Sequence, residues 1–171
     1  MPSEVIIGLG LVLGVAGALW RLQISRLARR LFGREHRVRM VHGRWVIEAT
    51  SKSRSVKYVT GGTGPWPALT YLMVESPIAK PFAIAGESVE GVIPDAARSD
   101  IDTLRRRDGF KRLDAVKGAA GAVPIFARVT WLHPGQGVML RRFTRSGGDA
   151  DFVCRDIEAM HRIADAVAKA D

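Results

Sequence analysis

An uncharged, glycine-rich apolar segment runs from Val5 to Trp20 and is followed at once by an arginine-rich segment that extends to Arg39. As a helix, the apolar segment rises roughly 24 Å, slightly less than the hydrocarbon thickness of about 30 Å. Including Met1 and allowing Arg21 to snorkel brings about twenty residues into the span. We therefore expect a single transmembrane helix at residues 1–20, with Trp20 at the membrane interface.

The distribution of charge around this segment predicts its orientation. Glu4 is the one charged residue before it, whereas seven arginines follow it: Arg21, Arg26, Arg29, Arg30, Arg34, Arg37 and Arg39. By the positive-inside rule, the N-terminus lies outside and the remaining chain is cytoplasmic. The excess of arginine over lysine, with abundant alanine and glycine, suggests a bacterium, and hence its inner membrane. A cleaved signal peptide is the alternative, but its basic residues would precede the apolar segment.

Small residues recur every four positions within the expected span. Gly10, Gly14 and Ala18 share one helix face, and Gly17 lies beside them. Such a row lets a second transmembrane helix approach closely. The alternative is that glycine is simply more frequent in membrane helices than in soluble ones. We favour a helix-packing face.

The basic charge is concentrated beside the apolar segment. The chain has a net charge of +9 and a pI near 10.6. Residues 1–57 contain eleven Lys and Arg against three Asp and Glu, whereas residues 58–171 contain fifteen against fourteen. A nucleic-acid-binding domain would carry its basic residues on the folded body, so we expect no nucleic-acid partner. We instead expect anionic lipid headgroups to contact Arg21, Arg26, Arg29, Arg30 and Arg34.

Residues 21–36 form the expected basic juxtamembrane helix or linker. Its apolar side chains fall on one helical stripe, which comprises Trp20, Ile24, Leu27, Ala28 and Leu31. Gly33 supplies a natural end for the helix. The helix either continues from the membrane or lies on the headgroups. Alternatively, the apolar stripe packs on the protein's own body.

Residues 37–171 predict one cytoplasmic α+β domain. Alternating apolar and polar residues predict strands, and two segments have helical periodicity, the second of which carries a continuous apolar stripe. Because strands and helices do not alternate, we expect a mainly antiparallel sheet with a C-terminal helix. The expected strands are 37–41, 44–50, 56–60, 68–75, 82–85, 123–132 and 137–144, and the expected helices are 99–107, capped by Ser99, and 151–169.

No motif in this domain predicts an active site. Gly61–Gly64 lacks the Lys-Ser/Thr of a phosphate-binding loop and is followed by two prolines, so we interpret it as a turn. Trp66 lies between those prolines and either packs on the core or, like Trp20, anchors the protein to lipid or a partner. The four histidines have no metal-ligand spacing, so we expect no metal. Cys154, the acidic pair Asp149 and Asp151, and Arg105–Arg107 are best interpreted as structural or solvated residues.

We therefore expect a non-catalytic accessory subunit of a larger membrane complex, of photosynthetic or respiratory type, with no cofactor of its own. Its span would pack against the other subunits, and its domain would dock on their cytoplasmic face. The layout is similar to that of the H subunit of purple-bacterial photosynthetic reaction centres, but no motif is shared and no residue role is transferred. The alternatives are a membrane-tethered enzyme or ligand-binding domain, or a lipid-recruited regulator.

Overall fold

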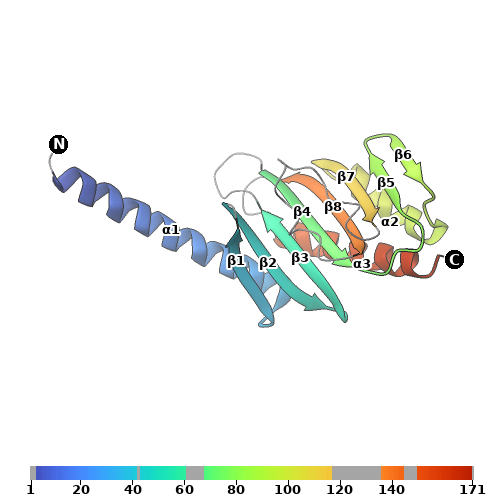
Figure 1. Ribbon diagram of the computed structural model, residues 1–171, viewed down its shortest axis with the longest axis horizontal. Coiled ribbons are helices and arrows are strands. Elements are labelled where there is room, and N and C mark those ends of the chain that lie inside the picture. Colours follow the sequence, from blue (N-terminus) through green and yellow to red (C-terminus); the bar gives the residue numbers. More distant parts are fainter. Residues whose placement is uncertain (1–2, 42, 61–67, 117–135, 145–149, 171) are drawn as a thin grey trace.

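The computed structural model describes the backbone of residues 3–41, 43–60, 68–116, 136–144 and 150–170 (Figure 1). The side chains of residues 3–14, 16, 20, 68 and 116 are not among the described ones. In chain order, the elements are α1 (Ser3–Phe32), β1 (His36–Val41), β2 (Arg44–Ser51), β3 (Arg54–Thr60), β4 (Ala68–Glu75), β5 (Phe82–Ala85), β6 (Ser88–Gly91), α2 (Asp95–Arg106), β7 (Phe110–Val116), β8 (Gly137–Thr144) and α3 (Ala150–Ala168).

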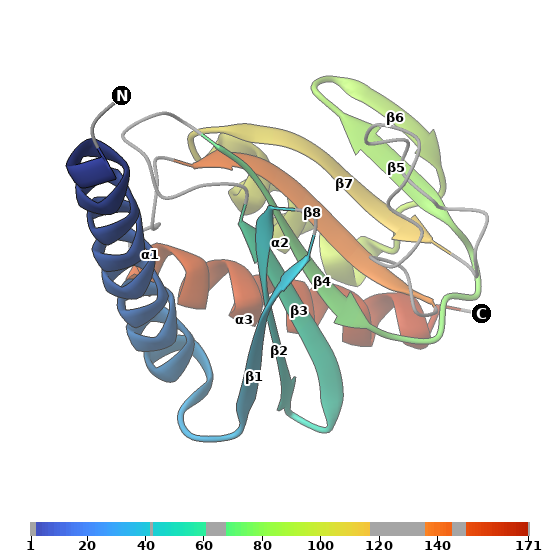
Figure 2. The same ribbon diagram turned by 60° about the vertical axis from the view of Figure 1, so that its left-hand side comes forward.

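The eight strands form one antiparallel sheet in the order β1-β2-β3-β4-β8-β7-β5-β6. Strand β8 pairs with β4 and β7, so it joins the N-terminal meander to the later strands. Helices α2 and α3 lie behind the sheet in Figure 2, and the C-terminal part of α1 runs beside β1. The expected α+β domain with an antiparallel sheet and a C-terminal helix is confirmed.

The main core lies between the sheet and these helices. The apolar stripe expected on the C-terminal helix is buried on α3, and it comprises Val153, Ile157, Met160, Ala164 and Val167. It packs with inward side chains of the central strands, among them Leu72, Val74 and Leu140. Because successive side chains of a strand point to opposite faces, residues two apart in these strands share the face of the sheet that the helices cover.

The expected strands at 68–75, 82–85 and 137–144 coincide with β4, β5 and β8. The expected helix at 99–107 was placed too late, because α2 begins at Asp95 after Pro94 and no side chain caps it. Ser99 lies inside α2, where its carbonyl oxygen accepts a hydrogen bond from Thr103 Oγ1. The expectation missed β6 and β7. The expected strand at 123–132 and the turn at Gly61–Gly64 lie outside the described residues.

Two glycines with similar backbone angles provide a test of the turn that leads into β7. Gly109 has φ +76° and Gly43 has φ +75°. A Cβ at Gly109 would collide with the Phe143 carbonyl oxygen, whereas nothing lies within 4 Å of one at Gly43. We expect Gly43→Ala to lower the free energy of unfolding by about 1 kcal/mol through backbone strain alone. Gly109→Ala should cost roughly 2 kcal/mol more in urea denaturation, and equal losses would contradict this packing.

Candidate membrane-facing helix and polar groove

Helix α1 has two parts with different surroundings. Its C-terminal part lies against β1, β2 and α3, whereas its N-terminal part extends beyond the sheet (Figure 1). The two parts form one continuous helix, Ser3–Phe32, so the basic segment does continue the preceding helix. Gly33 follows with φ +68°, and its amide donates a 2.9 Å hydrogen bond to the Arg29 carbonyl oxygen. The helix therefore ends where the sequence predicted.

The apolar stripe of the basic segment packs on the protein's own domain. Ile24, Leu27 and Ala28 are buried, and Leu31 and Phe32 are partly buried against the same core. The alternative that this stripe packs on the protein's own body is therefore observed, together with the continuation of the preceding helix. This packing ties the direction of the projecting helix to the domain.

A second apolar stripe on α1 faces away from the domain. Val15, Leu19 and Leu22 are 54%, 57% and 55% exposed, and their i, i+4, i+7 spacing puts them on one face. Arg26 and Arg29 follow Leu22 by four and seven residues, so they continue that face. Along one side of the helix, the exposed surface thus changes from apolar to basic within about one turn.

The five arginines expected at lipid headgroups are all exposed: Arg21, Arg26, Arg29, Arg30 and Arg34. Arg30 Nη2 lies 3.5 Å from Asp151 Oδ1, in an ion pair whose side chains are 66% and 70% exposed. Such an exposed pair contributes little to stability. The basic surface is therefore free to meet an anionic surface.

Most side chains of the expected span lie outside the described residues. Among the residues that the structure describes, no helix is long and apolar enough to cross a membrane, so these residues do not support the transmembrane helix. The surroundings of Gly10 and Gly14 and the side chains of Trp20 and Trp66 lie outside the described set. Nothing lies within 4 Å of a Cβ built on Gly17, and Ala18 is exposed.

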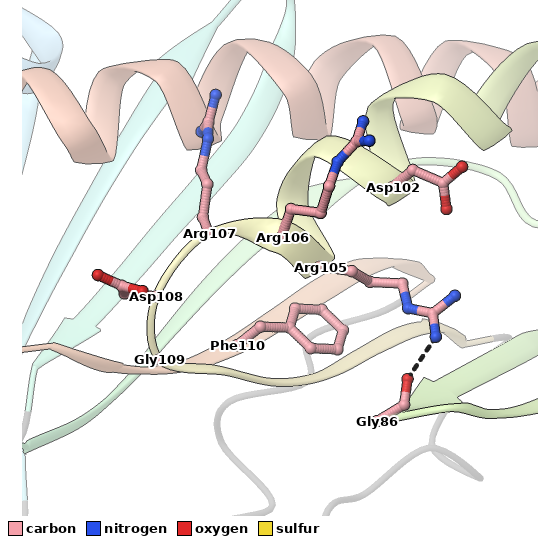
Figure 3. A pocket seen from close by; sticks show the side chains of 8 residues that line it. All are labelled: Gly86, Asp102, Arg105, Arg106, Arg107, Asp108, Gly109 and Phe110. Atoms are coloured by element: carbon pink, nitrogen blue, oxygen red, sulfur yellow. Dashed lines mark hydrogen bonds between the residues drawn. The ribbon is translucent and has the colours of Figure 1, made fainter.

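An open groove of about 660 Å³ lies where α2 ends and β7 begins (Figure 3). Its lining combines two glycines and an aromatic ring with charged side chains, and it comprises Gly86, Asp102, Arg105, Arg106, Arg107, Asp108, Gly109 and Phe110. Arg105 Nη2 donates a 2.7 Å hydrogen bond to the Gly86 carbonyl oxygen. The remaining charged groups point apart: Arg107 toward α3, and Asp102 and Asp108 to opposite sides. They do not converge on a place where one ligand would sit.

Behind the groove, Arg142 is buried among acceptors from two helices. Its Nε lies 3.0 Å from Asp156 Oδ2, and its Nη1 and Nη2 donate to the carbonyl oxygens of Leu104, Arg107 and Asp108 at 2.8–3.2 Å. Arg107 Nη1 lies 2.6 Å from Asp156 Oδ1. One arginine of β8 thus joins the C-terminal end of α2 to α3, which makes this network structural.

Burial shifts the pKa values of this network. Desolvation raises the pKa of Asp156 and outweighs the opposing effect of Arg142 and Arg107. Desolvation likewise lowers the pKa of Arg142, although Asp156 opposes the shift. Taking both charges out of water is therefore costly, and the contacts within the network offset only part of that cost.

The other reactive side chains do not form a catalytic group. Burial, and then the charge of Asp151, raises the pKa of the Cys154 thiol, so this cysteine is not an activated thiolate. Burial lowers the pKa of His161, whose Nε2 lies 3.2 Å from Ser51 Oγ. Within the described ranges, no group of three His, Cys, Asp or Glu side chains could hold a metal ion.

Comparison with protein-family models, curated proteins and solved structures finds no match. The candidate surfaces therefore rest on the geometry of this chain.

Sequence reasoning did not identify the Arg142 network. The signal that could have found it is the strand pattern of GVMLRRFT, in which Arg142 takes an inward position in line with Val138 and Leu140.

Proposed function

We propose that this protein is an accessory subunit of a membrane protein complex, anchored by the N-terminal part of α1 as a single transmembrane helix. The observation that carries the proposal is the exposed face of α1, where Val15, Leu19 and Leu22 give way to Arg26 and Arg29. A contiguous exposed apolar stripe is typical of a surface that contacts a membrane or another protein. The arginines that follow it are suited to contact with anionic headgroups. The uncharged run from Val5 to Trp20 extends the same helix outward.

The packing of α1 on the domain supports an assembly role over a flexible tether. Because Ile24, Leu27 and Ala28 are buried in the main core, the C-terminal part of α1 packs directly on the domain. A subunit that must dock on neighbouring proteins benefits from a fixed angle between its anchor and its domain. We place the N-terminus outside and the domain on the cytoplasmic side of a bacterial inner membrane, following the basic residues after the span.

The experiment that tests this function is extraction of the native protein from its membranes in a mild detergent, followed by size-exclusion chromatography with mass detection. The 18.7 kDa chain should elute within a larger particle that contains other polypeptides in fixed ratios. Elution of the protein alone in its detergent micelle, at every detergent concentration that extracts it, would contradict the accessory-subunit proposal.

The basic face yields a separate prediction. In a chain lacking residues 1–20, replacement of Arg26, Arg29 and Arg30 by glutamine should weaken binding to phosphatidylglycerol vesicles by about a hundredfold, since each basic residue near the surface contributes about 1 kcal/mol. The difference should shrink in 0.5 M salt, because salt screens exposed charges. Vesicle co-sedimentation measures it.

The matched control replaces three exposed arginines elsewhere, Arg98, Arg106 and Arg155, by glutamine. It lowers the net charge by the same amount without altering α1. An equal loss of vesicle binding in both triple variants would mean that lipid responds to total charge and not to this face.

A further inference from the structure

The face of the sheet turned away from α2 and α3 carries a second buried cluster. We call it the outer face, and its apolar side chains are Val46, Val59, Tyr71, Met73 and Met139. Cross-strand pairing places these residues next to one another, because Val59 is opposite Tyr71 and Met73 is opposite Met139. Charged side chains surround this small cluster on the same face.

Positive charge exceeds negative charge around this cluster. Glu48 pairs with both Arg39 and Lys57, at 2.8 Å and 3.0 Å. Asp114 pairs with both Arg112 and Arg141, at 2.7 Å and 3.2 Å. Each carboxylate thus pairs with two cations. Arg44 is a further cation on this face, and among the described residues no ion pair is found for it. The cations are Arg39, Arg44, Lys57, Arg112 and Arg141.

Four donors on this face are buried without a hydrogen-bond partner. One is Arg39 Nε, and the other three belong to neighbouring side chains: Arg44 Nη1, Arg141 Nε and Tyr71 Oη. The Arg44 guanidinium lies 5.7 Å from the centre of the Tyr71 ring, and Arg141 is directly opposite Tyr71 in the register of β4 and β8. Tyr71 is only 2% exposed. We call these three residues the donor cluster.

Buried donors without acceptors are costly, so such groups normally bind water or an ion. The surplus positive charge favours an anion over water. The segments that follow β3 and β7 in the sequence, residues 61–67 and 117–135, contain no Asp or Glu. Burial raises the pKa of Tyr71 despite the nearby arginines, so its hydroxyl stays protonated and can donate.

We propose that Arg44, Tyr71 and Arg141 form a binding site for a phosphate-type oxyanion, either free phosphate or a phosphate group carried on a lipid. Two guanidinium groups and a hydroxyl match the several acceptor oxygens of a tetrahedral anion, and arginine is suited to this recognition. The site lies on the sheet and does not depend on the proposed role of α1.

Equilibrium dialysis of the full-length protein in detergent with radiolabelled inorganic phosphate tests this site. We expect one phosphate per chain, and thermal unfolding should occur at higher temperature in phosphate than in chloride of equal ionic strength. Arg44→Gln should weaken phosphate binding by about tenfold to a hundredfold, the range expected for a charge-assisted hydrogen bond. Tyr71→Phe should weaken it less, without lowering the unfolding temperature in chloride, because its hydroxyl has no partner there.

Two controls separate this site from general effects. Tyr58→Phe removes a buried hydroxyl from the helix-covered face, and Arg98→Gln removes an exposed charge on α2. Both should bind phosphate as the wild type does. Phosphatidylglycerol vesicles that displace the bound phosphate would assign the site to lipid headgroups, and failure to displace it would assign the site to free phosphate.

No phosphate binding at 10 mM would mean that only water meets these donors, and it would overturn the proposal. Binding that is unchanged in both Arg44→Gln and Tyr71→Phe would also overturn it, because the ion would then be adventitious. Either result would leave the membrane proposal unaffected, since α1 contributes no residue to the donor cluster.

Discussion

Replacing Arg142 by methionine is expected to lower the free energy of unfolding by about 3–5 kcal/mol, the range for breaking a buried ion pair from one side. The substitution keeps a long apolar side chain but removes the donors that satisfy Leu104, Arg107 and Asp108. It also deprives the buried Asp156 of a counter-charge. Urea denaturation followed by circular dichroism measures the loss, provided that the unfolding is two-state.

The pH dependence of Arg142→Met separates the two causes of its instability, the unpaired carbonyl oxygens and the lost counter-charge of Asp156. Burial already raises the folded-state pKa of Asp156, and loss of Arg142 should raise it further. A carboxyl whose pKa is higher in the folded state binds protons more tightly there, so its unfavourable contribution grows as the pH rises through that pKa. The deficit of Arg142→Met relative to wild type should therefore shrink between pH 7 and pH 4. A constant deficit would attribute the loss to the unpaired carbonyl oxygens alone.

Arg162→Met is the matched control, because it removes an arginine that also links α3 to α2. Arg162 Nη2 lies 2.7 Å from Asp100 Oδ1, but the arginine side chain is 57% exposed. An exposed pair contributes about 0–1 kcal/mol, so this variant should be nearly as stable as the wild type. A similar loss in both variants would mean that burial is not what makes Arg142 important.

The sequence was sufficient to predict the elements whose periodicity matches their surroundings. Strands β4 and β8 have apolar residues at successive inward positions, and the apolar stripe of α3 is continuous. All three elements were therefore predicted nearly to the residue. Strand β7 was missed because its outward positions carry Arg112 and Asp114, which pair with each other, so that the fully buried apolar residues on its inward side are few, Leu113 and Ala115. Strand β6 was missed because all four of its residues are exposed.

The candidate sites were harder to predict because their partners are distant in sequence. The apolar stripe from Ile24 to Leu31 was recognised, but periodicity does not distinguish a lipid surface from the protein's own core. Alternation places Arg141 and Arg142 on opposite faces of the sheet. It does not reveal that Arg142 reaches the carbonyl oxygen of Leu104, or that Arg141 lies beside Tyr71, because both contacts depend on tertiary packing.

On the proposed function as an accessory membrane subunit, substitution of Gly14 by leucine is expected to remove the protein from its complex while leaving it in the membrane. Gly10, Gly14 and Ala18 recur at four-residue spacing in the continuous helix α1, so their positions share one face. No atom of the domain lies near Gly17, so the neighbouring small-residue surface is open at that level. Small residues allow a second helix to approach closely and gain packing contacts that lipid chains do not match.

A leucine at position 14 would fill the space that these small residues leave on the helix face without reducing hydrophobicity, so insertion should persist while assembly fails. A loss of only about 1.4 kcal/mol in helix association lowers the association constant tenfold. Val12→Leu is the control, because position 12 lies about 200° around the helix from Gly14 and adds bulk away from that face. Quantitative mass spectrometry of complexes purified from membranes with equal amounts of each variant measures the retained partners. Full retention of the partner proteins with Gly14→Leu would refute the packing face and leave α1 as a simple anchor. Loss of the partners with both variants would mean that added bulk anywhere on the helix disrupts assembly.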